Sequence, residues 1–161
     1  MPSLRTLKIS SVTVMTYKKI LMACPNLNSF ELSIFTSDQS EVDIQPHINL
    51  NRLIINVIDV IWPWNDHIFD NCLSCIPNLK KLDVYRSIFI SKITNWLVEY
   101  DWLAPKISLY LSSLTNFYFF FKIIQSQTYI EPDVENILCE MKQTFLNVHN
   151  HQYQSRYLVY Q

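Results

Sequence analysis

The chain has 161 residues, a formal net charge of −1 and no glycine; hydrophobic residues make up 49% of it and charged residues 17%. This length fits one domain with ample apolar material for a core. A near-neutral charge gives no electrostatic argument for binding nucleic acid or an anionic membrane. Phosphate-cradling loops depend on glycine, so a Walker loop and a dinucleotide-binding fingerprint are excluded.

A phrase of the form x-x-Leu-x-x-apolar-x-apolar occurs five times along the chain. Its copies are PSLRTLKI, PNLNSFEL, INLNRLII, PNLKKLDV and SSLTNFYF, which begin at residues 2, 25, 48, 77 and 112. Apolar residues that alternate in this way are typical of half-buried strands. We therefore predict strands near residues 4–9, 27–32, 50–55, 79–84 and 114–119, and a closing strand at 157–160, in the stretch YLVY.

Helical periodicity fills most of the intervals between these phrases. The segment 13–24 places Val14, Tyr17 and Leu21 on one face, as in an amphipathic helix. Segments 65–76, 91–103 and 131–146 repeat the pattern, and the last has Pro132 in a first-turn position. Residues 33–47 have no such stripe and are predicted to form a loop or a poor helix.

Alternating strands and helices in units of about 20–30 residues predict a repeat architecture. One unit cannot bury the apolar sides of its strand and helix alone, whereas stacked units share a core. We predict that residues 1–161 form a single α/β domain with a parallel sheet of about five or six short strands and helices on one face. An ordinary α/β domain in which the phrases are similar by chance is the alternative.

Two of the phrases carry a cysteine shortly before Leu: CPNL at 24–27 and CIPNL at 75–79. They resemble the cysteine-containing class of leucine-rich repeats, which is common in the substrate-binding half of F-box proteins, the adaptors of cullin-type ubiquitin ligases. The resemblance implies a solenoid and a non-catalytic protein-binding function. The first phrase starts at residue 2, with no room for an F-box before it. We therefore expect a fragment, which would reach a ligase core only through an N-terminal F-box outside it.

Cysteine usage bears on both compartment and chemistry. Four cysteines in a chain of this length are not a disulfide framework, and no signal peptide is visible, so a cytoplasmic or nuclear setting is predicted. Cys72-x-x-Cys75, with His67 nearby, could be half of a zinc site or a redox pair, but a second ligand pair is missing. Cys72 falls on the apolar stripe of its helix, so we predict that these thiols are ordinary core residues. His149 and His151 likewise have no evident third ligand. No metal, cofactor or catalytic residue is predicted.

Strand alternation also predicts which side chains point away from the core. In each phrase this is the residue between the last two apolar positions: Lys8, Glu31, Ile54, Asp83 and Tyr118. Residues two positions away share that face: Arg52, Lys81, Tyr85, Asn116 and Phe120. A spacing of about 4.8 Å between strands arranges the first set as a ladder about 20 Å long.

Tyrosine and arginine are residue types that anchor partner proteins, so this concave face is predicted to bind an unidentified protein substrate. A face that is merely solvated or covered by a missing segment is the structural alternative. The functional alternatives are a small α/β enzyme or redox domain centred on Cys72 and Cys75, and a repeat fragment with no function of its own.

Overall fold

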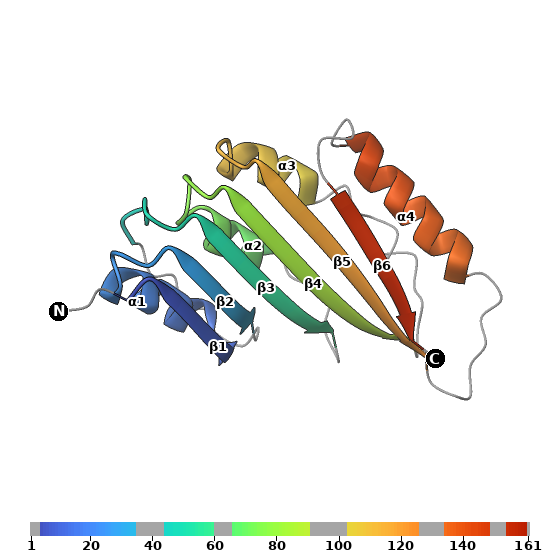
Figure 1. Cartoon of the computed structure of the whole chain (residues 1–161), viewed down its shortest axis with the longest axis horizontal. Coiled ribbons are helices and arrows are strands. Elements are labelled where there is room, and N and C mark those ends of the chain that lie inside the picture. Colours follow the sequence, from blue (N-terminus) through green and yellow to red (C-terminus); the bar gives the residue numbers. More distant parts are fainter. Residues whose placement is uncertain are drawn as a thin grey trace.

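The strands form one parallel sheet in which the order of the strands is the order of the chain. The computed structural model describes residues 4–34, 44–59, 66–90, 103–125, 134–148 and 154–160. Within these residues the sheet has six strands, each parallel to its neighbours (Figure 1): β1 (Thr6–Val12), β2 (Ser29–Ile34), β3 (Arg52–Asp59), β4 (Lys81–Ile90), β5 (Asn116–Gln125) and β6 (Gln154–Tyr160). The predicted α/β class with a parallel sheet is confirmed.

Within the described ranges, helices precede four of the strands: α1 (Val14–Ala23), α2 (Asp66–Leu73), α3 (Leu103–Tyr110) and α4 (Val134–Val148). Three of these lie in segments where helical periodicity was found. Helix α3 was not predicted, and its segment contains Pro105. Proline is tolerated there because the first turn of a helix needs no N–H donor. Of the predicted helix at 91–103, only the last residue belongs to the described part of the chain.

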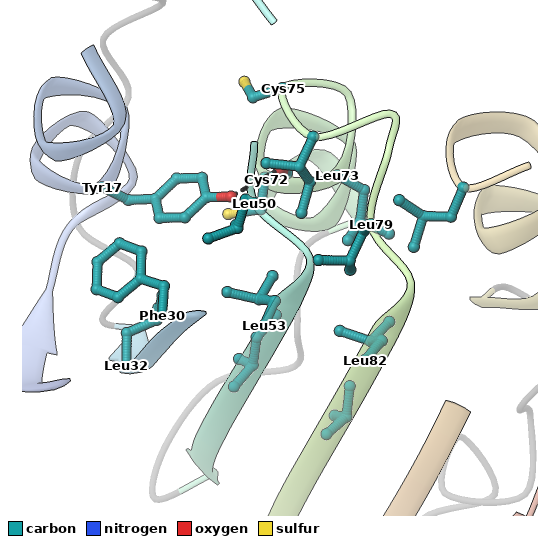
Figure 2. Packing of buried hydrophobic residues seen from close by; sticks show 14 of the residues in the cluster. Tyr17, Phe30, Leu32, Leu50, Leu53, Cys72, Leu73, Cys75, Leu79 and Leu82 are labelled. Atoms are coloured by element: carbon teal, nitrogen blue, oxygen red, sulfur yellow. Dashed lines mark hydrogen bonds between the residues drawn. The ribbon is translucent and has the colours of Figure 1, made fainter. Parts of the chain in front are cut away.

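The core lies between the sheet and the helices. Inward residues alternate along β2 to β5 and are at most 5% exposed: Phe30, Leu32, Leu53, Ile55, Leu82, Val84, Phe117 and Phe119. The Tyr17 ring of α1 stacks on Phe30 with 5.7 Å between ring centroids, and the Phe145 ring of α4 lies 5.5 Å from that of Phe117. Figure 2 shows Leu53 and Leu82 on neighbouring strands beneath α2. The described helices therefore contribute to the same core as the inward side of the sheet.

The turns before the strands share one hydrogen-bond pattern. Two successive N–H groups donate to a single carbonyl in the preceding turn: Asn28 and Ser29 to Arg5, Asn51 and Arg52 to Asn28, Lys80 and Lys81 to Asn51, and Thr115 and Asn116 to Lys80. The recurring leucines lie inside these turns. The N–H groups of Leu27, Leu79 and Leu114 bond to the carbonyl three residues earlier, and these leucines are at most 5% exposed.

The predicted strand boundaries are wrong for this reason. The phrase leucine belongs to the turn, so β2 to β5 begin two residues later than predicted. The strands also run further: β4 and β5 each contain 10 residues and are not short. Leu27, Leu50, Leu79 and Leu114 nonetheless belong to one hydrophobic cluster, which matches the prediction that the phrases share a core.

Polar contacts join the helices that cover the sheet. The hydroxyl of Tyr17 donates to the carbonyl of Cys72 over 3.2 Å, across α1 and α2 (Figure 2). Lys106 of α3 contacts both carboxylate oxygens of Asp70 of α2, at 2.6 and 2.7 Å. His47 is only 6% exposed and connects the ends of α1 and α2. Its ring Nε2 lies 2.9 Å from the carbonyl oxygen of Cys24, and its backbone N–H donates to the carbonyl of Cys75.

Among the residues that the structure describes, no helix combines the length and the apolarity that crossing a bilayer requires.

Candidate functional site

Three successive rows of outward residues on β1 to β5 are in register. The middle row runs directly across β1 to β5 and contains Lys8, Glu31, Ile54, Asp83 and Tyr118. The row before it contains Thr6, Ser29, Arg52, Lys81 and Asn116, and the row after it contains Ser33, Asn56, Tyr85 and Phe120. We call these fourteen residues the outer face. Their role in binding stays a prediction.

Sequence reasoning named ten of these residues and missed four: Thr6, Ser29, Ser33 and Asn56. The same alternation, carried two residues further along β1, β2 and β3, would have found them. Ser33 and Asn56 lie in the same row as Tyr85.

The β1–β2 end of the outer face is charged and open to solvent. The ammonium of Lys8 lies 2.6 Å from Oε1 of Glu31, and these side chains are 74% and 28% exposed. An ion pair this exposed adds little stability, because water screens it and both side chains must be held in place. Lys8 thus presents a positive charge that projects further into solvent than its partner carboxylate.

The centre of the outer face holds a second ion pair with a recessed carboxylate. Both Nη2 and Nε of Arg52 donate to Oδ2 of Asp83, over 2.8 and 3.3 Å. The Asp83 side chain is only 8% exposed, whereas that of Arg52 is 49% exposed. The hydrogen bond to Asp83 raises the pKa of Arg52. Asp83 was predicted as an accessible contact residue, but the structure buries it among its neighbours.

The β4–β5 end of the outer face is aromatic. The rings of Tyr85 and Phe120 stack with centroids 4.4 Å apart and an interplanar angle of 2°, and the Tyr118 ring lies 6.2 Å from that of Phe120. Tyr85 remains 39% exposed. Partial burial, followed by the Asp83 carboxylate, raises the pKa of the Tyr85 phenol above its ordinary value. The cluster presents flat apolar area with a phenol at its border.

Cys72 and Cys75 lie under the helices, away from the outer face. Cys72 is 1% exposed, and its burial, followed by the nearby Cys75, raises the pKa of its thiol above the ordinary value. The Cys75 thiol donates to the carbonyl of Asn71 over 3.2 Å. A reactive cysteine needs a thiolate, which burial disfavours here.

The histidines considered as metal ligands lie outside the described side chains. The side chain of His67 is outside the described part of the structure, as are His149 and His151. Among the side chains that are described, no group of three or more His, Cys, Asp or Glu residues is placed to hold a metal ion.

Comparison of the chain with protein-family models, with curated proteins and with solved structures found no match. The geometry of the outer face is therefore the basis on which a function is proposed.

Proposed function

We propose that the chain is a non-catalytic protein-binding module and that a partner protein docks on the outer face. The observation that carries the proposal is that the aromatic cluster of Tyr85, Phe120 and Tyr118 and the exposed guanidinium of Arg52 lie on the same face of the sheet. Tyrosine and arginine dominate the binding energy of many protein interfaces. The described helices contribute to the core on the opposite side of the sheet, so they leave this combination uncovered.

We further propose that the architecture is a leucine-rich-repeat-like solenoid. Three features support it: the strands follow one another in chain order, the same turn recurs before β2 to β5, and the leucines of the last four phrases share one cluster. Repeat units that contact only their neighbours produce this kind of order. A solenoid offers one continuous sheet face to a partner, which suits binding better than catalysis.

The finer proposal is that this face recognises substrates for an F-box-type ubiquitin ligase. It rests on the two phrases CPNL and CIPNL, in which Leu27 and Leu79 occupy equivalent turn positions. The same proposal places the chain in the cytoplasm or the nucleus, where thiols stay reduced. The redox alternative at Cys72 and Cys75 is less favoured, because burial raises the pKa of Cys72.

Site-specific photocrosslinking tests the binding face. A photoreactive phenylalanine analogue is placed at Asn56 on the outer face, and in a matched variant at Leu109, which is 72% exposed on α3. The Asn56 probe should crosslink a reproducible set of proteins in cells, and Tyr85→Ser should remove this set. The same set from both positions, or a set that survives Tyr85→Ser, would contradict the assignment.

The ligase proposal has its own test. The chain is fused behind a well-characterised F-box, and the abundance of each crosslinked protein is followed in cells. The partner should fall in abundance, recover when the proteasome is inhibited, and stay unchanged when the fusion carries Tyr85→Ser. A partner that binds the fusion without losing abundance would support the binding module and contradict the substrate-receptor role.

A further inference from the structure

We infer that the outer face binds an extended acidic segment of a partner protein that also carries an apolar side chain. This inference rests on the proposed binding function and names the chemistry of the partner. It is carried by the charge that the face presents to solvent, by one like-charged pair within the sheet, and by the distance from that pair to the aromatic cluster.

The accessible charge of the outer face is positive although the face contains both signs. Its carboxylates are recessed, with the side chain of Glu31 28% exposed and that of Asp83 8% exposed. Its cations project outward, with Lys8 74% and Arg52 49% exposed. Lys81 is exposed as well. A partner that approaches this face therefore meets ammonium and guanidinium groups first, and carboxylates complement them.

Arg52 and Lys81 are direct partners across β3 and β4. Like charges placed opposite each other on neighbouring strands destabilise a sheet. Asp83 offsets part of this repulsion, but both hydrogen bonds that it accepts from Arg52 use a single oxygen, Oδ2. A carboxylate from a partner, placed between Arg52 and Lys81, would neutralise the remaining charge and form charge-assisted hydrogen bonds with both side chains.

The aromatic cluster lies further along the same strands. Lys81 and Tyr85 are four residues apart on β4, which corresponds to about 13 Å at about 3.3 Å per residue. An extended partner segment covers this distance with four residues. The partner is thus expected to carry an Asp or Glu about four residues from an aromatic or large aliphatic side chain, which would pack on the Tyr85–Phe120 stack.

Single-stranded nucleic acid also combines negative charge with flat rings, and it is the main competing occupant. The outer face favours the peptide, because the cations are few, two carboxylates lie among them, and the whole chain has a net charge of −1. Nucleic-acid grooves carry continuous positive charge along the backbone path. A second copy of this chain is the other competing occupant.

Selection from a random twelve-residue phage-displayed peptide library on the immobilised chain tests the inference. Enriched peptides are synthesised with a fluorophore, and dissociation constants are measured by anisotropy. We expect a net negative charge and an acidic residue about four positions from an aromatic or large aliphatic one. Lys81→Glu should weaken binding at least about tenfold through like-charge repulsion. The control Lys19→Glu makes the same charge change at an exposed position of α1. It should change the dissociation constant by no more than about twofold.

Each outcome separates this inference from the proposed function. Peptides that lose affinity on Tyr85→Ser but are not acidic, or that tolerate Lys81→Glu, would overturn the acidic partner and keep the binding face. Peptides that bind Tyr85→Ser and Lys81→Glu like the unmodified chain, or a selection with no enrichment over bare support, would overturn both. Circular dichroism verifies that each variant is folded.

Two further measurements address the competing occupants. Tighter binding of a labelled twenty-nucleotide oligothymidine than of the selected peptides would assign the face to nucleic acid and overturn the inference. Dimerisation in sedimentation velocity that Lys81→Glu abolishes would assign it to a second copy, with the same consequence. A chain that stays monomeric, does not bind the oligonucleotide and binds the acidic peptides would support the inference.

Discussion

Arg52 and Asp83 form a diagonal ion pair across β3 and β4 in which one partner is exposed and the other is not. The guanidinium is half exposed, whereas the carboxylate is almost fully buried. The loss of one partner therefore has a different energetic cost from the loss of the other. Removal of Asp83 leaves an arginine that water can solvate. Removal of Arg52 leaves a recessed carboxylate without its principal donor, which costs more than the pair contributes.

We therefore expect Arg52→Ala to lower the free energy of unfolding by about 1–3 kcal/mol and Asp83→Ala to lower it by less. The double variant should be close to Asp83→Ala alone. Urea unfolding of the four proteins measures this cycle. Lys8→Ala is the control, because its exposed pair with Glu31 should contribute only about 0.2–1 kcal/mol. Equal losses for Arg52→Ala and Asp83→Ala would contradict the asymmetry.

The core at the centre of the sheet makes a second prediction. Leu53 is fully buried among the inward residues of β3, so Leu53→Ala should lower the free energy of unfolding by about 2–5 kcal/mol. Leu109→Ala, at a position 72% exposed on α3, should change it by no more than about 0.5 kcal/mol. Chemical denaturation measures both. If Leu53→Ala left the free energy of unfolding unchanged, the sheet and the helices would not share the core described.

We expect the buried phenol of Tyr17 to make the chain less stable at alkaline pH. Burial, followed by the nearby Cys72 and Cys75, raises the pKa of this phenol well above its ordinary value of 10.0. The unfolded chain releases the Tyr17 proton at about pH 10, whereas the folded chain retains it. The contribution of Tyr17 to the free energy of unfolding is therefore fully present below pH 10. Above pH 10 it falls by about 1.4 kcal/mol per pH unit, until the folded-state pKa is reached.

Tyr17→Phe should remove this contribution. The variant should be less stable than the unmodified chain near pH 8 by about 1 kcal/mol, because the hydrogen bond to the Cys72 carbonyl is lost. Its stability should then decline less steeply between pH 10 and pH 11. Urea unfolding at a series of pH values provides the comparison. Identical slopes for the two proteins would show that Tyr17 ionises freely in the folded state.

The cysteines make a prediction that bears on the redox alternative. Cys139 is exposed on α4 and should react with a disulfide reagent in the folded chain. Cys72 should react only as the chain unfolds, because its thiol is buried and its pKa is raised. Mass spectrometry of labelled peptides distinguishes the sites, and Cys139→Ser should abolish the fast modification of that helix. Rapid labelling of Cys72 in the folded chain would support the redox alternative.

Periodicity in the sequence predicted the features that depend on neighbouring residues. Alternation separated Phe30 and Leu32 from Glu31, and the structure buries the first two fully while leaving Glu31 partly accessible. The spacing of the phrases predicted a parallel α/β arrangement, and the strands follow in that order. These inferences succeeded because side-chain direction along a strand follows from local backbone geometry.

Tertiary contacts decided the rest. The strands begin after the phrase leucines because the N–H of Leu79 bonds within its turn, and no pattern of apolar residues encodes that choice. Asp83 is buried, and Arg52 reaches it from the neighbouring strand. The stack of Tyr85 on Phe120 likewise requires the register of two strands separated along the chain. A single sequence specifies which side chains share a face, whereas the packing of distant segments determines which of them meet and which remain open to a partner.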